Sequence, residues 1–287
     1  MKIKSVIQIH PLLLCLLLVS YLFGLFVEMI CLFLLIFIHE CGHLIAARYF
    51  GWEIKRLVIW PFGGVMETED FYNRPTKEEL IVTLAGPLQH IWVFGVIELL
   101  TYTTFPTVYL DQLFWLNTML LLFNILPILP LDGGRFLFLC IGHWLPFYRS
   151  LLVTSIFSLV VIPITNGILF INGWVSPPLL ILSIILWFDN WFTYRNLHLL
   201  LMKHMLARYM HHPVDRNNIH FLYVSAHTTF QEMMKQFRKN RYHMIQINRQ
   251  SVLTEDDYLQ LLFSRQPRYS MLGEDIHANP ILSNKNG

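Results

Sequence analysis

The stretch FLLIFIHECGHLIAARYF, residues 33–50, combines a strongly apolar run with the pattern His39-Glu40-x-x-His43. A run of this kind is typical of a helix that crosses a membrane. Ionisable groups inside such a helix are costly to remove from water, so they usually serve a function. The stretch therefore predicts both a helical membrane protein and the place of its functional site.

The composition of the whole chain also indicates a membrane protein. Of its 287 residues, 55% are hydrophobic and only 14% are charged, against roughly 25% charged in soluble domains. The formal charge of +2 is too small to indicate direct binding of nucleic acid. We expect an α-helical polytopic membrane protein with six transmembrane helices. The predicted spans are at about 11–27, 30–48, 81–100, 112–131, 150–171 and 178–194.

Lysine and arginine residues are distributed unevenly among the predicted loops. They precede the first span, follow the second, bracket the connection after the fourth and occur again from Arg195 onward. The loops after the first, third and fifth spans contain none. Because basic loops stay on the cytoplasmic side, the pattern predicts a multi-pass protein with both termini in the cytoplasm.

The region after Arg195 no longer has the composition of a membrane segment. It alternates predicted strands with helices that begin at threonine caps, which indicates a small α/β cytoplasmic domain. Its predicted elements are strands at 219–224 and 242–248 and helices at 228–240 and 254–263. The predicted division is a membrane domain at 1–195, a linker helix at 196–212 and a C-terminal domain at 213–287.

The two histidines are spaced for joint binding of a metal ion. On a helix, residues four apart lie on one face, so His39 and His43 can direct both imidazoles at one ion. Glu40 can approach metal-bound water without binding the metal, as in zinc hydrolases. The alternative is that these are polar residues that pack helices together. That alternative leaves the high cost of burying three ionisable groups unexplained.

Catalytic zinc needs three protein ligands and one open position. The third ligand must lie at the membrane depth of His39 and His43, in the cytoplasmic half of the second predicted span. Asp132 lies at that depth near the end of the fourth span, which runs in the same direction. His90 and Asp189 are competitors at similar depth, but neither has the irregular backbone expected near Asp132.

Prolines and glycines make the end of the fourth predicted span irregular. They are Pro127, Pro130, Gly133 and Gly134. Irregular backbone at membrane depth is tolerated where it lines a cavity or is buried in protein, and a hydrolase needs such a place for water. Asn124 is a candidate donor to a substrate carbonyl or to the developing oxyanion. An interhelical hydrogen bond is an equally good interpretation of Asn124.

Three motifs together resemble the site-2 protease family of intramembrane zinc metalloproteases. They are the His-Glu-x-x-His pattern, NILPILPLDGG at 124–134 and AGPLQH at 85–90. The motif PFGG at 61–64 brings the resemblance closest to the sporulation branch of that family. The resemblance covers all six predicted spans, and the C-terminal region is similar to a single CBS-type module.

The resemblance implies a role for each matching residue. His39, His43 and Asp132 would hold one Zn²⁺ per chain, and Glu40 would be the catalytic base. The implied reaction is hydrolysis of a peptide bond in the N-terminal pro-sequence of a sporulation sigma factor precursor. The implied location is the mother-cell membrane that surrounds the forespore.

The resemblance also implies partners. Membrane-embedded inhibitory and regulatory proteins would control the protease, and membrane lipid would surround it. The PFGG hairpin would position substrate by strand pairing, unless it is only a surface turn. CBS modules commonly pair and bind ATP or another adenine nucleotide. With a single module, a nucleotide site would need two copies of this chain to associate through the C-terminal domain, or contributions from elsewhere. The basic cluster RKNRYH at 238–243 would then meet phosphates, or else form a solvated face.

Two other functional classes are consistent with part of this pattern. A membrane metal transporter or channel regulated by the CBS-like domain would also place histidine and aspartate inside the membrane. It would give no task to Glu40. An inactive membrane receptor could keep the fold for binding alone. Substitution of Glu40 by glutamine separates these classes, because it should abolish proteolysis and leave metal flux or binding largely intact.

Overall fold

A computed structural model of the protein describes residues 7–9, 11–60, 63–68, 70–211, 216, 218–225, 227–248 and 251–264. The basic residues at 2 and 4, the Pro61–Phe62 turn of the PFGG motif and residues 265–287 lie outside this description. The chain forms two compact units. The first holds Met1–Phe71 and Lys77–Leu137, and the second holds Tyr72–Thr76 and Phe138–Gly287.

Four helices among the described residues are long and apolar enough to cross a membrane. They are α2 (Phe26–Tyr49), α3 (Thr76–Thr101), α4 (Thr107–Ile125) and α6 (Phe147–Ile171). The 24 residues of α2 extend over ~36 Å, more than the ~30 Å hydrocarbon core of a bilayer. The first predicted span is α1 (Pro11–Leu22), which has only 12 residues, and the last is α7 (Pro177–Arg195). Neither is among the four, so the count of six spans stays a prediction.

The fourth predicted span ends earlier than expected. Helix α4 stops at Ile125, and α5 (Asp132–Trp144) begins after a non-helical stretch. Pro127 and Pro130 explain the break, because proline has no N–H to donate and disfavours a helical residue before it. The predicted irregular backbone is therefore confirmed just before Asp132. The expectation that the glycines at 133 and 134 share it is wrong, because both are helical.

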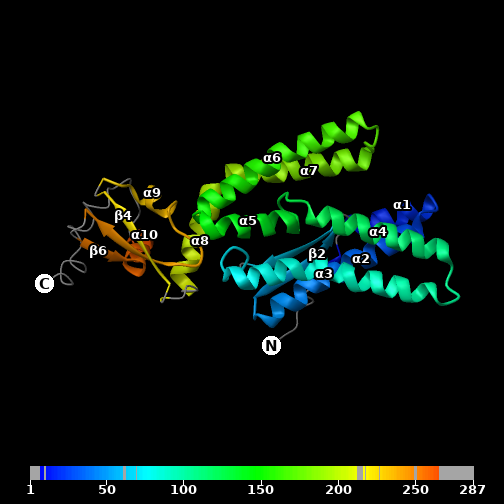
Figure 1. Cartoon of the computed structure of the whole chain (residues 1–287), viewed down its shortest axis with the longest axis horizontal. Coiled ribbons are helices and arrows are strands. Elements are labelled where there is room, and N and C mark those ends of the chain that lie inside the picture. The colour runs from blue at the N-terminus through cyan, green and yellow to red at the C-terminus, as the bar shows by residue number, and fades with distance from the viewer. Residues whose placement is uncertain are drawn as a thin grey trace. The chain divides into compact units, whose positions relative to one another are not determined.

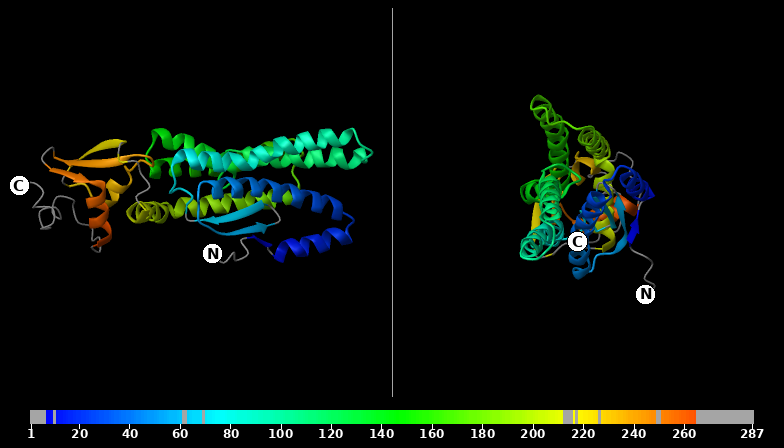
Figure 2. Two further views of the ribbon diagram at one scale, coloured as in Figure 1. Left: turned by 90° about the horizontal axis from the view of Figure 1, so that it is seen from below. Right: turned by 90° about the vertical axis from the view of Figure 1, so that its right-hand side faces the viewer.

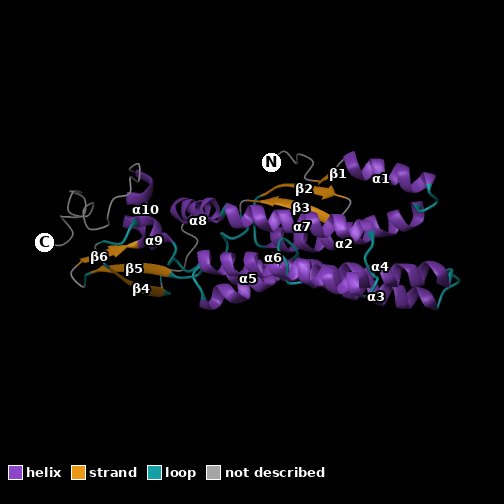
Figure 3. Ribbon diagram, turned by 90° about the horizontal axis from the view of Figure 1, so that it is seen from above, coloured by secondary structure: helices purple, strands orange, loops and turns teal. Residues whose placement is uncertain are grey.

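The first unit contains a three-stranded sheet in the order β1-β2-β3 (Figure 3). Strands β2 (Ile54–Trp60) and β3 (Gly63–Thr68) pair antiparallel, with Val58 opposite Val65. The hairpin expected around PFGG is therefore confirmed. Strand β1 (Ile7–Ile9) pairs parallel with β2. Sequence analysis missed β1 because it runs almost directly into the apolar α1.

Two buried clusters hold the first unit together. One joins α2 to the sheet and to α3, and consists of Ile36, Leu44, Ala47, Trp52, Leu57, Met66 and Val82. The other joins α2 to the paired helices α3 and α4, and consists of Leu35, Val93, Ile97 and Leu110. Helices α3 and α4 run antiparallel beside each other (Figure 2), with the rings of Phe94 and Phe114 5.1 Å apart. These contacts fix α2 between the sheet and the helix pair.

The second unit contains two parts. Helices α6 and α7 run side by side (Figure 1), and α8 (Leu197–His211) follows them. The C-terminal part has strands β4 (Ile219–Val224), β5 (Tyr242–Ile247) and β6 (Ser251–Thr254) and helices α9 (Phe230–Met234) and α10 (Glu255–Ser264). Both predicted strands and both predicted helices are confirmed, although α9 is shorter than expected. Strand β6 was missed because it has only 4 residues.

The buried side chain of Arg208 ties α8 to the C-terminal α/β part. Its guanidinium forms an ion pair of 2.6 Å with Glu255. It also donates to the main-chain carbonyls of Arg238, Lys239 and Arg241 at 2.7–3.1 Å. The basic cluster at 238–243, interpreted above as a phosphate contact or a solvated face, therefore directs three main-chain carbonyls at an arginine. This arrangement gives the loop a structural role.

His243 lies in the same buried network. Its Nδ1 is 2.9 Å from Glu255, and its Nε2 accepts the backbone N–H of Arg238 at 3.1 Å. Because Nε2 is an acceptor, the proton of the neutral ring lies on Nδ1. Burial lowers the pKa of His243 to about 4, although the hydrogen bond to Glu255 acts in the opposite direction. The network is therefore built around a neutral imidazole.

The segment Tyr72–Thr76 connects β3 to α3 in sequence but belongs to the second unit. His204 of α8 bonds the Asn73 side chain at 3.1 Å. Asn240, from the basic loop, accepts the Thr76 backbone N–H at 3.2 Å. Two side chains from the C-terminal half of the chain thus bond the segment Tyr72–Thr76 within the second unit.

Candidate metal centre

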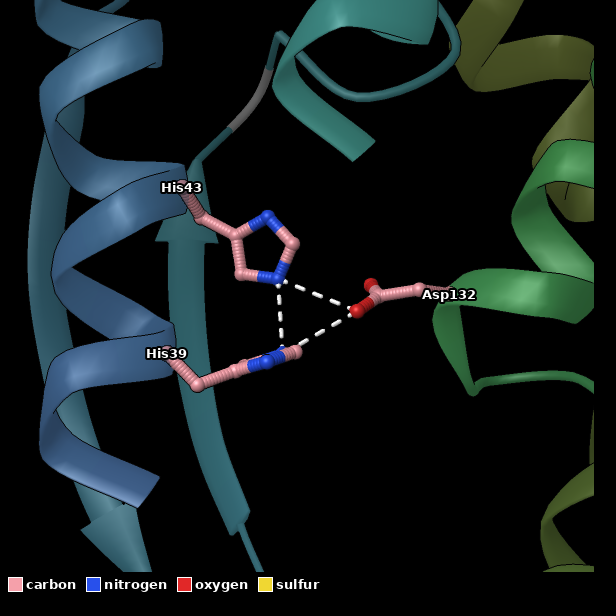
Figure 4. A group of neighbouring side chains, drawn as sticks. All are labelled: His39, His43 and Asp132. Carbon is pink, nitrogen blue, oxygen red and sulfur yellow. Dashed lines mark hydrogen bonds and ion pairs between the residues drawn. The ribbon is translucent and has the colours of Figure 1, made fainter. Parts of the chain in front are cut away.

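Helix α2 presents two imidazoles to one carboxylate (Figure 4). His39 and His43 are one turn apart, and their ring centroids are separated by 4.8 Å. Both rings face Asp132, the first residue of α5. The Oδ2 atom of Asp132 lies 3.1 Å from His39 Nε2 and 3.2 Å from His43 Nε2. The two Nε2 atoms are 3.1 Å apart, so three donor atoms form a nearly equilateral triangle.

The size of this triangle fits zinc. A tetrahedral ion with bonds of ~2.0–2.1 Å needs donor atoms ~3.3 Å apart, close to the distances of 3.1–3.2 Å found here. All three side chains are buried, with 4–7% of each residue exposed. A His₂Asp set also leaves the fourth position of the ion open, as a catalytic site requires.

The ring of His43 is held in the form that binds metal. Its Nδ1 lies 2.8 Å from the main-chain oxygen of Val82 on α3. A carbonyl can only accept, so Nδ1 carries the proton and Nε2 directs its lone pair at the triangle. A main-chain carbonyl of α3 therefore fixes the tautomer of His43 on α2.

The ring of His39 has a different neighbour. Its Nδ1 lies 3.1 Å from Nε2 of His90 on α3. His90 Nδ1 lies 2.6 Å from the side-chain oxygen of Asn117 on α4. His90 was considered as a competing ligand and the structure places it behind His39. Asn117 was missed, and its only sequence signal is a polar side chain inside an apolar span.

Gly86 lets α3 approach the two imidazoles. A Cβ atom at this position would lie 2.8 Å from His39 Nε2 and still closer to His43. Such contacts are shorter than any side chain accommodates without movement. The glycine of the AGPLQH motif thus makes room for the candidate ligands.

Glu40 points to the hairpin. Its Oε1 accepts the backbone N–H of Gly64, in strand β3, at 3.0 Å. A Cβ atom at Gly64 would overlap the Glu40 carboxylate, with 2.8 Å to Oε2. The second glycine of PFGG therefore provides both a donor and the space for the Glu40 side chain. The PFGG motif could be identified from the sequence, but its contact with Glu40 could not be predicted.

Asn124 is the one predicted site residue that lies outside the buried group. It is half-buried near the end of α4, and its Nδ2 donates to Leu120 of the same helix at 3.0 Å. The structure thus gives Asn124 an intrahelical hydrogen bond, and its part in the reaction stays a prediction.

Comparison with known proteins identifies relatives over nearly the whole chain. Residues 27–108 match the family model of Peptidase family M50. The chain is 34% identical to Stage IV sporulation protein FB of Bacillus subtilis, over 93% of this chain and 95% of that protein. It is 31% identical to a zinc metalloprotease of Methanocaldococcus jannaschii, over 50% of this chain and 43% of the relative.

A solved structure supports the fold. The site-2 protease from Methanocaldococcus jannaschii superposes with a TM-score of 0.53 at 23% identity. The match covers 68% of this chain and 94% of the solved one. Because the sequence match extends over nearly the whole chain, the chain belongs to the site-2 protease family of zinc metalloproteases, Peptidase family M50.

Proposed function

We propose that this protein is an intramembrane zinc metalloprotease that hydrolyses a peptide bond of a membrane-associated pro-protein. The observation that carries the proposal is the buried triangle of His39 Nε2, His43 Nε2 and Asp132 Oδ2, with edges of 3.1–3.2 Å. Glu40 follows the first of these residues and is itself buried. Membership of a protease family favours hydrolysis over metal transport, which gives Glu40 no task.

Each side chain has a separate task in this mechanism. His39, His43 and Asp132 would hold one zinc ion, whose chemistry is polarisation of a carbonyl and acidification of water. Glu40 accepts the proton of the attacking water and delivers it to the leaving amine. Because Gly64 N–H holds Oε1 at 3.0 Å, we assign the proton to Oε2.

Asn124 is assigned to the substrate carbonyl or to the oxyanion that develops from it. Its Nδ2 donates to Leu120 O at 3.0 Å. An amide nitrogen carries two hydrogens, so the second can bind a substrate oxygen without loss of this bond. The half-buried position near the end of α4, eight residues before Asp132, supports this task.

We infer that the substrate is a sigma factor precursor, cut in its N-terminal pro-sequence. The similarity to Stage IV sporulation protein FB over 93% of the chain supports this class of substrate. The mother-cell membrane around the forespore and membrane-embedded regulatory proteins belong to the same inference. The PFGG hairpin, which contacts Glu40 through Gly64, is assigned to positioning of the substrate.

We further infer six spans with both termini in the cytoplasm, since the basic residues favour that topology. Lipid contact is supported by exposed apolar side chains on α6, such as Ile164 and Ile168, which are 54% and 55% exposed. The CBS-like character of the C-terminal domain, its adenine nucleotide and its pairing between two copies rest on the resemblance of the sequence alone.

The proposal is tested by co-expression of a tagged pro-sigma substrate with the wild type and with Glu40→Gln. Both proteins are checked for equal accumulation and for zinc content. We expect the wild type to cut the substrate and the zinc-loaded variant to leave it intact. Equal cleavage by both would contradict the mechanism. If neither cuts, the substrate assignment fails and metal flux is measured next.

A further inference from the structure

Two buried polar residues next to the candidate metal centre have no task in the mechanism above. His90 is 1% exposed and Asn117 is 0% exposed. We propose that they are positioning residues, which hold His39 in the tautomer and orientation that bind zinc. This inference rests on the proposed function, because it assigns a task toward the same metal.

The directions of the hydrogen bonds follow from one main-chain carbonyl. Nδ2 of Asn117 lies 3.1 Å from the backbone oxygen of His90. A carbonyl only accepts, so this end of the amide is its NH₂ group and the other end, Oδ1, is an acceptor. Oδ1 lies 2.6 Å from His90 Nδ1. His90 Nδ1 must therefore be the donor in this bond.

The same logic passes from His90 to His39. In a neutral imidazole with its proton on Nδ1, Nε2 is an acceptor. His90 Nε2 lies 3.1 Å from His39 Nδ1, which must then be the donor. The proton of His39 is thus on Nδ1, and the lone pair of Nε2 is free for a metal ion. Asn117 determines, through His90, which nitrogen of His39 can act as a ligand.

Because these residues are buried, their hydrogen bonds determine the tautomer and orientation of His39. The three residues come from α2, α3 and α4, and each is at most 4% exposed. Bulk water therefore has no ready access to replace a lost partner. An imidazole without a fixed partner divides its population between two tautomers and several ring orientations, and only one of these binds zinc.

His90 is not assigned as a fourth ligand. Its contact is with Nδ1 of His39, whereas the triangle is formed through Nε2. Both of its own ring nitrogens are engaged, with His39 and with Asn117. The fourth position of the ion thus remains available for water, as hydrolysis requires.

The test uses the purified full-length protein, four single variants and the double variant that combines His90→Leu with Asn117→Leu. His90→Leu and Asn117→Leu remove the chain of bonds. His90→Gln restores it, since its side-chain oxygen can accept from His39 and its NH₂ group can donate to Asn117. Asn190→Leu is the matched control, because Asn190 is an equally buried amide that donates to its own helix at 2.8 Å.

Zinc affinity is measured by competition with a chelator of known affinity, and the ligand geometry is read from the visible absorption of the cobalt form. We expect His90→Leu and Asn117→Leu to weaken zinc binding by about 10- to 100-fold and to alter the cobalt spectrum. The double variant should be little weaker than the worse single one, because both changes break one network. His90→Gln and the control should bind zinc nearly as the wild type does.

Each outcome supports or overturns the inference. Wild-type affinity and an unchanged cobalt spectrum in His90→Leu would overturn the inference and leave the proposed function intact. Equal loss in His90→Gln and His90→Leu would also overturn it, since the direction of the bonds would then be irrelevant. If His90→Leu does not fold, Asn117→Leu decides in its place. A wild type that binds no zinc overturns the proposed function itself, and the inference with it.

Discussion

Replacement of Gly86 by alanine tests how closely α3 approaches the candidate ligands. The added methyl carbon would lie 2.8 Å from His39 Nε2 and closer to His43. Carbon and nitrogen atoms normally stay at least ~3.4 Å apart in a packed interior. Either α3 moves away from α2, or the two imidazoles turn away from the position that they share with Asp132.

The size of the effect follows from the cost of overpacking. An extra methyl group in a well-packed interior costs about 1–3 kcal/mol. The neighbours here are the ligand atoms themselves, so we expect most of that cost to appear in zinc binding. At about 1.4 kcal/mol for each factor of ten, zinc affinity should fall by about 5- to 150-fold. Cleavage should fall at least as far, because hydrolysis depends on the same two rings.

Gly95 provides the matched control. It lies on the same helix, and a Cβ atom there would meet no atom within 4 Å in the part of the chain that the structure describes. Gly95→Ala should keep wild-type zinc affinity and slightly raise stability, by about 0.5–1 kcal/mol. The assay compares chelator competition and substrate cleavage in both variants. If Gly86→Ala matches Gly95→Ala in both readouts, α3 does not lie against the imidazoles as described.

Three further results are expected. Gly64→Ala should reduce cleavage by tenfold or more while zinc content stays unchanged, because its methyl group would displace the candidate base and not a metal ligand. Arg208→Leu should lower stability by about 3–5 kcal/mol, since it leaves buried polar partners unpaired. Arg216→Leu removes an exposed ion pair and should change stability by less than about 1 kcal/mol; thermal unfolding compares the two. The pKa of His243 is lowered to about 4 in the folded chain, so the unfolded chain binds more protons between pH 6.5 and 4. This difference in proton binding makes the folded chain about 3 kcal/mol more stable above pH 6.5 than at pH 4. Hydrogen exchange of peptides from 219–264 should show the loss of stability as the pH falls.

The meeting of the three candidate ligands could be predicted from the sequence. His39 and His43 could be predicted because helical spacing places residues four apart on one face. Asp132 could be predicted because the positive-inside rule predicts the same membrane depth for the ends of the second and fourth spans. Four helices long and apolar enough to cross a membrane followed from hydropathy, and all elements of the C-terminal part except β6 followed from strand patterns and capping residues.

Other parts depend on contacts that spacing does not contain. Asn117 is 27 residues from His90, and only the antiparallel pairing of α3 with α4 brings them together. Helix α5 was missed because two prolines and two glycines hide a helix that starts immediately after the break. The role of Gly64 requires the fold of the hairpin onto α2, since its N–H bonds a carboxylate 24 positions away. The contacts of Asn117 and Gly64 join residues far apart in the sequence, so a local sequence pattern does not predict them.

The grouping of Tyr72–Thr76 with the C-terminal half affects how shortened versions of the chain should be interpreted. A protein cut after Arg195 would lose His204 and Asn240, which bond Asn73 and Thr76. Helix α3 carries Gly86 and His90, which contact the candidate ligands. Loss of proteolysis on truncation would therefore not demonstrate that the missing domain recognises substrate or nucleotide, since residues 72–76 would lose their hydrogen-bond partners at the same time. Point substitution of Asn240 is the cleaner way to separate support of residues 72–76 from recognition by the domain.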